Sequence, residues 1–182
     1  MLTKEISEVE RKRIRFPKLN RFDGMETPPE ALEYIIPYLD KNLTYWECCY
    51  GRGHMAKQLT KRGFKVVGNE NIDCLKEQPK EWNFLITNPP FSNNKDFIRR
   101  AIELNKPFAL LIRLEHLGGK EAMELLKDLN FKVIIPKKRI NYITPKMKQG
   151  IKVGGSQFHS IWLTYKVNLP KQINYKDVEN AN

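Results

Sequence analysis

Residues 84–97 read F-L-I-T-N-P-P-F-S-N-N-K-D-F, and this stretch predicts the end of a strand followed by the start of a helix. Its apolar beginning is typical of a buried strand. The two prolines stop that strand, because proline has no N–H to donate to a sheet and fixes φ. They also favour an extended conformation for Asn88. We therefore expect Asn88 and Phe91 to be held rigidly at a strand end, a position more typical of functional sites than of ordinary turns.

On either side of this stretch, apolar segments alternate with helical ones. We expect strands at 44–46, 64–68, 82–87, 108–113, 131–135 and 158–167. We expect helices after an N-cap at Thr27, from 54 through Lys61, over about 94–105 and over about 120–129. Strands separated by helices indicate βαβ units and a mostly parallel sheet with helices on both faces. The last two strands are joined by a loop without a helix, so we expect them to pair antiparallel at one edge.

The chain has 182 residues, which suits one domain with a real core. Its 32 Lys and Arg against 21 Asp and Glu give a net charge of +11. Such a surface suits a polyanion, of which nucleic acid is the commonest, although many basic proteins bind none. No run approaches the roughly 18 apolar residues of a membrane span, and the first residues do not begin a signal peptide. We therefore expect a cytoplasmic protein with no membrane partner.

Cysteines and histidines predict no metal site. Three cysteines are an odd number, and their spacing fits neither a disulfide framework nor a zinc pattern. The histidines are scattered along the chain. The residues concerned are Cys48, Cys49, Cys74, His54, His116 and His159. We expect reduced thiols packed in the core or beside a cofactor.

A second candidate site follows the first strand. Gly51-x-Gly53 opens a helix and lets the backbone approach a ligand, although two glycines alone are a weak nucleotide signal. Glu70 ends the second strand, where an acid can bind two ribose hydroxyls. The alternative interpretation is that Glu70 is an ordinary surface residue. Asp73 can accept a hydrogen bond from an adenine amino group or simply form a turn. Together these residues indicate a cofactor that contains adenosine.

Asn88-Pro89-Pro90-Phe91 and the glycine loop together resemble the class I S-adenosylmethionine-dependent amino-methyltransferases, whose signature is [N/D/S]-P-P-[Y/F/W]. Over roughly residues 22–167 the chain is similar to the small phage and bacterial DNA adenine N6-methyltransferases. The resemblance implies a Rossmann-like α/β fold, methyl transfer and a bacterial or phage-infected cell. The chain departs from the family pattern in three places. Cys48, Cys49 and Tyr50 differ from the family's first loop, Glu70 stands at the position of the ribose-binding aspartate, and Asn83 replaces the aspartate at the head of the catalytic strand.

The resemblance also implies residue roles. S-adenosyl-L-methionine would be bound by Thr27, Pro28, Glu47, Gly51, Gly53, Glu70, Asp73 and Asn88. The catalytic residues would be Asn88, Pro89, Pro90 and Phe91. The Asn88 side-chain oxygen and the Pro89 carbonyl would accept both N–H groups of the target amine, and Phe91 would stack on the base. The methyl donor is already activated, so positioning supplies most of the catalysis.

The predicted organisation is a basic arm at 1–22, a methyltransferase domain at 23–167 and a tail at 168–182. Within the domain, 136–157 form a basic loop with an interleaved aromatic, Tyr142, and such a loop suits contacts to a nucleic-acid backbone. A plain surface loop is the alternative. Its candidate contacts are Lys137, Lys138, Arg139, Lys146, Lys148 and Lys152. RNA amino groups, a protein glutamine and an inactive binding domain remain alternatives to DNA methylation. We expect no room for a separate target-recognition domain, so that sequence specificity is low, comes from this loop or comes from a protein partner.

Overall fold

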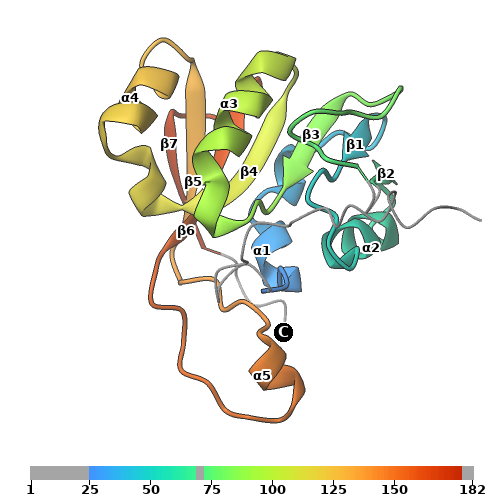
Figure 1. Cartoon of the computed structure of the whole chain (residues 1–182), viewed down its shortest axis with the longest axis vertical. Helices are drawn as coiled ribbons and strands as arrows, with labels where there is room; N and C mark the ends of the chain where they lie inside the picture. The colour runs from blue at the N-terminus through green and yellow to red at the C-terminus, as the bar shows by residue number, and fades with distance from the viewer. Residues whose placement is uncertain (1–24, 69–71, 178–182) are drawn as a thin grey trace, which may run out of the picture.

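Seven strands form one sheet in the order β2-β1-β3-β4-β6-β5-β7 (Figure 1). This computed structural model describes residues 25–68 and 72–177, so the predicted basic arm and Glu70 lie outside the described residues. The strands are β1 Thr44–Trp46, β2 Lys65–Val67, β3 Phe84–Thr87, β4 Phe108–Arg113, β5 Phe131–Pro136, β6 Ser160–Tyr165 and β7 Ile173–Lys176. All neighbours pair in parallel except β6, which is antiparallel to β4 and β5. The predicted Rossmann-like α/β fold is confirmed.

Helices cover both faces of this sheet, as predicted (Figure 1). The α-helices are α1 Pro29–Glu33, α2 His54–Lys61, α3 Asn94–Leu104, α4 Lys120–Leu126 and α5 Pro145–Lys148, and the 3-10 helices are Ile36–Tyr38, Phe91–Asn93 and Leu114–Leu117. Side chains of α1 and α2 pack on one face, with Ile86 and Trp162 from the strands. Those of α3 and α4 pack on the other, with Leu85 and Leu163. Leu85 and Ile86 enter opposite cores because successive strand residues alternate in direction.

None of the helices in the described part of the chain is long and apolar enough to span a bilayer.

The strand that precedes Asn88 is central. All four residues of β3 are buried, between parallel neighbours β1 and β4. A parallel strand covered on both faces reads as a continuous apolar run, which explains the sequence of 84–87. The carboxyl ends of β1, β3 and β4 therefore meet at one edge of the sheet, where ligands bind in folds of this class.

Four details differ from the sequence-based expectations: the start of the first helix, the place of β6, the presence of β7 in the predicted tail, and the short helix α5 in the loop between β5 and β6, where no helix was predicted. The first helix begins at Pro29 with Pro28 as N-cap, because the Thr27 hydroxyl bonds Asn88 instead of capping the helix. The strand predicted to be last, β6, does pair antiparallel with β5, but it lies between β4 and β5. The edge is taken by β7, which lies in the segment predicted as a tail and pairs in parallel with β5.

The segment between β5 and β6 projects from the sheet and carries the short helix α5 (Figure 1). The Thr144 hydroxyl caps α5 by accepting a hydrogen bond from the Met147 N–H at 3.2 Å. At its base the segment is bound to the start of the described chain. Glu26 and Ile143 exchange two backbone hydrogen bonds, of 2.9 and 3.1 Å. The predicted basic loop is therefore anchored beside Thr27.

Candidate active site at the carboxyl edge of the sheet

Asn88 follows β3 directly, and its amide is held in one orientation. Its Nδ2 group donates a hydrogen bond to Thr27 Oγ1 at 3.1 Å. Its Oδ1 atom is buried and has no hydrogen-bond partner among the described residues. Most buried polar side-chain atoms have a partner, so an orphaned acceptor indicates a ligand or a functional role. The sequence predicted the position of Asn88, and Thr27 fixes which of its two amide atoms is left free.

Phe91 lies in a cluster of aromatic rings and is only 6% exposed. Its ring makes edge-to-face contacts with Phe158, at a centroid distance of 5.1 Å, and with Tyr142, at 5.4 Å. We call these three rings the aromatic cluster. Arg113, at the end of β4, places its guanidinium 4.2 Å from the Phe158 centroid and 5.1 Å from that of Phe91. A base can therefore stack on Phe91 only if a neighbouring ring moves.

Part of this environment could not be read from the sequence. Tyr142 was predicted only as an aromatic within a basic loop, and Phe158 had no predicted role. The Tyr142 hydroxyl donates to Ser160 Oγ at 2.9 Å, and burial raises the pKa of Tyr142 so that it stays protonated. Arg113 also forms an ion pair with Glu115 at 2.7 Å.

A second buried amide lies close to Asn88 in the chain. Asn94 begins α3 and is 2% exposed, and neither of its amide atoms has a partner among the described residues. Its only sequence signal is its place three residues after Phe91.

Glu47 follows β1 and is a buried acid, 3% exposed. Burial raises its pKa to about 8, against the lowering effect of a hydrogen bond from the backbone of Ala56 in α2. Its Oε2 atom has no partner in the described part of the chain. Gly51 and Gly53 both have positive φ, of 49° and 70°, which favours glycine at these positions. The loop thus places a buried, unpartnered carboxyl oxygen and glycine backbone near the amino end of α2.

Tyr50, one of the residues that depart from the family pattern, occupies the space that glycines leave. A Cβ added to Gly53 would lie 2.8 Å from the Tyr50 ring, and one added to Gly68 would lie 2.4 Å from it. Tyr50 and Gly68 also line an open pocket of about 660 Å³ along α2 and β2. The acceptor and backbone groups fit the methionine end of S-adenosylmethionine, but a ligand seated against Gly53 requires the Tyr50 ring to rotate away.

Asp73 lies in a turn between β2 and β3. Its carboxylate accepts a hydrogen bond from the Leu75 N–H at 3.3 Å and pairs with Lys76 at 3.0 Å. These are the contacts of a turn residue, the alternative that the sequence left open. Its contact with adenine stays a prediction, as does the ribose contact of Glu70.

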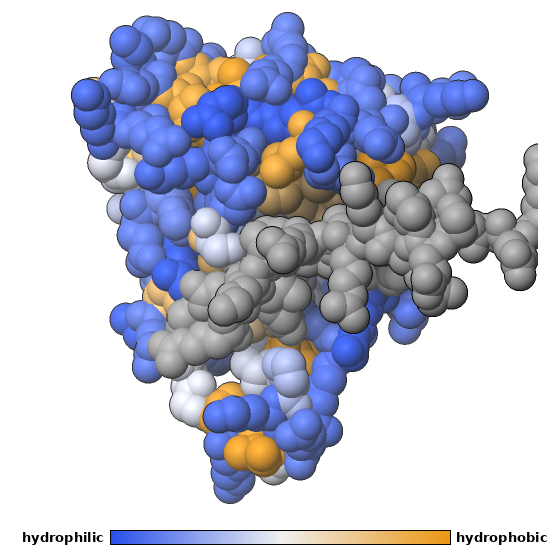
Figure 2. Space-filling model, viewed as in Figure 1, coloured by the Kyte–Doolittle hydropathy of each residue, from blue (hydrophilic) through white to orange (hydrophobic). Residues whose placement is uncertain are grey.

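The predicted cationic residues of the basic loop fall into two groups. Three have partners: Lys137 pairs with Asp177 at 2.5 Å, Lys148 pairs with Glu26, and Arg139 donates to the Ser156 carbonyl at 3.2 Å. The other three are exposed, and the structure records no ion pair for them among the described residues. They are Lys138, Lys146 and Lys152. Figure 2 shows the projecting segment, at the bottom of the view, as mainly hydrophilic with small hydrophobic spots.

Comparison with known proteins finds no matching family model and no matching curated protein. A dimethyladenosine transferase from Plasmodium falciparum aligns over 79% of this chain and 63% of its own, with 12% identity and a TM-score of 0.48. A protein described as a predicted O-methyltransferase from Agrobacterium tumefaciens aligns over 74% of this chain and 66% of its own, with 12% identity and a TM-score of 0.35. At this level of similarity neither protein's activity transfers to this chain.

Proposed function

We propose that this chain is an S-adenosylmethionine-dependent methyltransferase that acts on an exocyclic amino group of a nucleobase, with adenine N6 in DNA as the expected target. The observation that carries the proposal is the buried, unpartnered Oδ1 of Asn88 at the end of the central strand. An acceptor of this kind matches an N–H donor of a flat amine. Because Thr27 holds Nδ2, the amide offers its oxygen without having to reorient.

The proposed role of Asn88 is to hold and polarise the target amine. The lone pair of that amine is delocalised into the ring, so the nitrogen is a poor nucleophile until its geometry changes. Hydrogen bonds to Asn88 Oδ1 and, as the second acceptor, to the Pro89 carbonyl would draw the nitrogen toward a tetrahedral geometry. Both oxygens would also stabilise the positive charge that develops on nitrogen, without reorganisation at the moment of reaction.

When bound, the cofactor would supply a methyl group activated by a sulfonium. Glu47 and the backbone of Gly51 and Gly53 would hold its methionine part, where an ammonium group would favour the ionised form of the Glu47 carboxyl against the effect of burial, which raises its pKa. Phe91 would supply a stacking surface worth roughly 1–3 kcal/mol per base. Flipping a base out of a duplex costs roughly a few kcal/mol, and the stacking energy would offset part of that cost.

The net charge of +11 supports a nucleic-acid substrate over a protein glutamine. The test incubates the purified protein with labelled S-adenosylmethionine and either DNA or RNA of matched sequence, followed by mass spectrometry of the nucleosides. We expect N6-methyladenine in DNA and its loss with Asn88→Ala. If RNA is methylated and DNA is not, the substrate is RNA. The absence of methylation in both polymers, with Asn88→Ala behaving like the parent protein, would refute methyl transfer.

The position of Tyr50 supports one second candidate, a catalytically inactive domain that binds nucleic acid or a protein partner. Its ring fills the approach to Gly53 and Gly68 that a bound cofactor would use. Thermal melting separates the two functions, because a ligand that binds the folded chain raises Tm by mass action. An enzyme melts at a higher temperature with millimolar S-adenosylmethionine, whereas an inactive domain shows no shift.

A further inference from the structure

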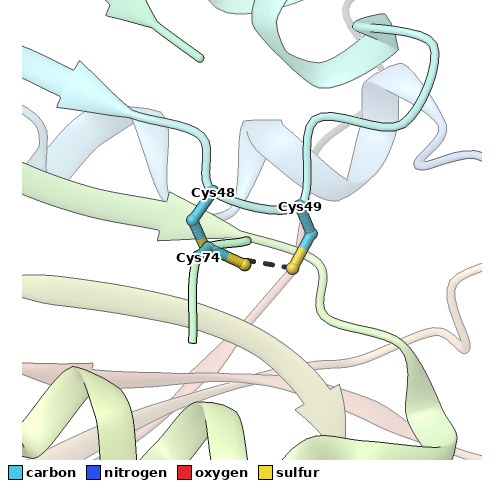
Figure 3. A group of neighbouring side chains, drawn as sticks. All are labelled: Cys48, Cys49 and Cys74. Carbon is cyan, nitrogen blue, oxygen red and sulfur yellow. Dashed lines mark hydrogen bonds between the residues drawn. The ribbon is translucent and has the colours of Figure 1, made fainter. Parts of the chain in front are cut away.

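Three cysteines that are far apart in the sequence meet in the folded chain. Cys48 and Cys49 lie in the loop after β1, and Cys74 comes from the loop between β2 and β3; Figure 3 shows their side chains pointing toward one another. The three Sγ atoms all lie within 4.8 Å of one another, and those of Cys48 and Cys49 are 3.8 Å apart. All three are free thiols. We call them the cysteine cluster.

The cysteine cluster is separate from the aromatic cluster. Cys48 and Cys74 are 7% and 8% exposed and belong to the core beneath α3 and α4, together with Trp46 and Trp82. Phe91 belongs to the core on the opposite face of the sheet. The three thiols therefore lie on the opposite side of the sheet from Phe91, the residue proposed to stack on the base.

We propose that the cysteine cluster binds one thiophilic metal ion, with Zn²⁺ as the expected ion. Thiolate sulfur is a soft ligand that selects such ions. With zinc–sulfur bonds of about 2.3 Å, two sulfurs on a tetrahedral ion lie about 3.8 Å apart. Cys48 and Cys49 already have this separation, and Cys74 reaches it by a shift of less than about 1 Å. The spacing along the chain could not predict this site, because loop geometry alone brings Cys74 to the adjacent pair.

Metal binding would release protons from the cysteine cluster. Three thiols release three protons to solvent as three metal–sulfur bonds form, which changes the charge of the ion and its ligands from +2 to −1. The fourth position of the ion is left to water or to an added thiol. Bound metal would join the glycine loop after β1 to the loop before β3, so it would stabilise the folded chain against unfolding. This site does not depend on methyl transfer.

The test uses the full chain, reduced and stripped of metal, and titrates it with Zn²⁺ against a chromophoric chelator. We expect one equivalent to bind. Each single change to serine at Cys48, Cys49 or Cys74 should weaken zinc binding by at least roughly 10- to 100-fold. That is the loss seen when a residue that only hydrogen-bonds to a metal ligand is replaced, and loss of a ligand itself should cost no less. His54→Ala, which removes a partly exposed imidazole, should leave the affinity unchanged and serves as the matched control.

Two measurements on the parent protein keep the proposal testable if the variants fold poorly. X-ray absorption of the zinc-loaded protein should show three sulfur neighbours at about 2.3 Å. The Cd²⁺ adduct should show thiolate-to-metal charge-transfer absorption of an intensity typical of three sulfurs. Zinc binding no tighter than in a variant with all three cysteines changed to serine would overturn the proposal. So would a Cys48–Cys49 disulfide in the freshly purified protein, detected as the loss of two hydrogen masses.

Discussion

Replacing Asn88 by alanine should nearly abolish methyl transfer while leaving the folded chain almost as stable as before. The activity effect follows from the loss of a preorganised acceptor for the transition state. Removal of one such hydrogen-bonding group from an active site typically costs about 100- to 1000-fold in kcat. The free-energy effect is small because two contributions to folding oppose each other.

The first contribution is the hydrogen bond from Asn88 Nδ2 to Thr27 Oγ1, 3.1 Å long. Its loss costs roughly 0.5–1.5 kcal/mol. The second is the unpartnered Oδ1, whose burial costs about 1–3 kcal/mol in the parent protein and is relieved by truncation. A small void offsets part of that relief. The free energy of unfolding should therefore stay within about 1 kcal/mol of the parent value, a Tm change of about 2–4 °C at most for a chain of this length.

Asn174 in β7 is the matched control because its amide is fully paired. Its Nδ2 donates to the carbonyls of Val133, at 3.1 Å, and Lys171, at 2.6 Å, and its Oδ1 accepts from the Lys171 N–H at 3.2 Å. The same change to alanine removes all three hydrogen bonds, so Asn174→Ala should lose roughly 2–4 kcal/mol of stability. Its methyl transfer per folded molecule should be retained.

The assay pairs urea unfolding, followed by circular dichroism, with the transfer of labelled methyl groups to DNA at a temperature where both variants are folded. If Asn88→Ala loses as much stability as Asn174→Ala, or keeps its methyl transfer, then Asn88 is a structural residue and the reasoning is wrong.

Three further predictions follow from the described side chains. Tyr50→Ala should bind S-adenosylmethionine several-fold more tightly in calorimetry and Tyr50→Phe should not, because only alanine vacates the space against Gly53; weaker binding by Tyr50→Ala would show instead that the ring contacts the cofactor. Neutralising the three exposed lysines of the projecting segment should reduce the slope of log DNA affinity against log salt concentration by about 0.9 for each phosphate contact that is lost. Those three are Lys138, Lys146 and Lys152. Lys65→Ala on the edge strand β2 should leave that slope unchanged. The hydrogen bond from Lys95 lowers the pKa of Glu121 below its ordinary value. The stability from this carboxylate is therefore present above the ordinary pKa and is lost as the pH falls through the lower, folded pKa. In thermal melts, Glu121→Gln should lose less stability than the parent protein between pH 7 and pH 3.

Much of the fold could be predicted because local signals agree with the tertiary structure. The run at 108–113 is apolar almost throughout and forms β4 with the predicted bounds, since a central strand is buried on both faces. β7 could not be predicted in the same way. It is four residues long and half exposed, and it exists because its backbone pairs with β5. A strand whose stability comes from a distant neighbour has no local pattern by which to recognise it.

In the candidate site, too, some features follow from neighbouring residues and others from residues far away in the sequence. The position of Asn88 follows from two prolines beside it, a local constraint. The orientation of its amide depends on Thr27, which is 61 positions away and looked like a helix cap in the sequence. The burial of Phe91 likewise depends on contacts with Tyr142 and Phe158, which come from the distant segment between β5 and β6. Sequence locates the residues at strand ends, and only the fold shows which partners they have there.

The place of β6 between β4 and β5 has a consequence for synthesis of the protein. A nascent chain that ends at residue 159 already contains both outer partners, Phe108–Arg113 and Phe131–Pro136, but not the strand that joins them. Each partner then presents apolar side chains and unpaired backbone groups, which favours association with other chains. The ribosome must therefore release the chain through Tyr165 before the sheet can close, and chaperones that shield strand edges should matter most in that interval.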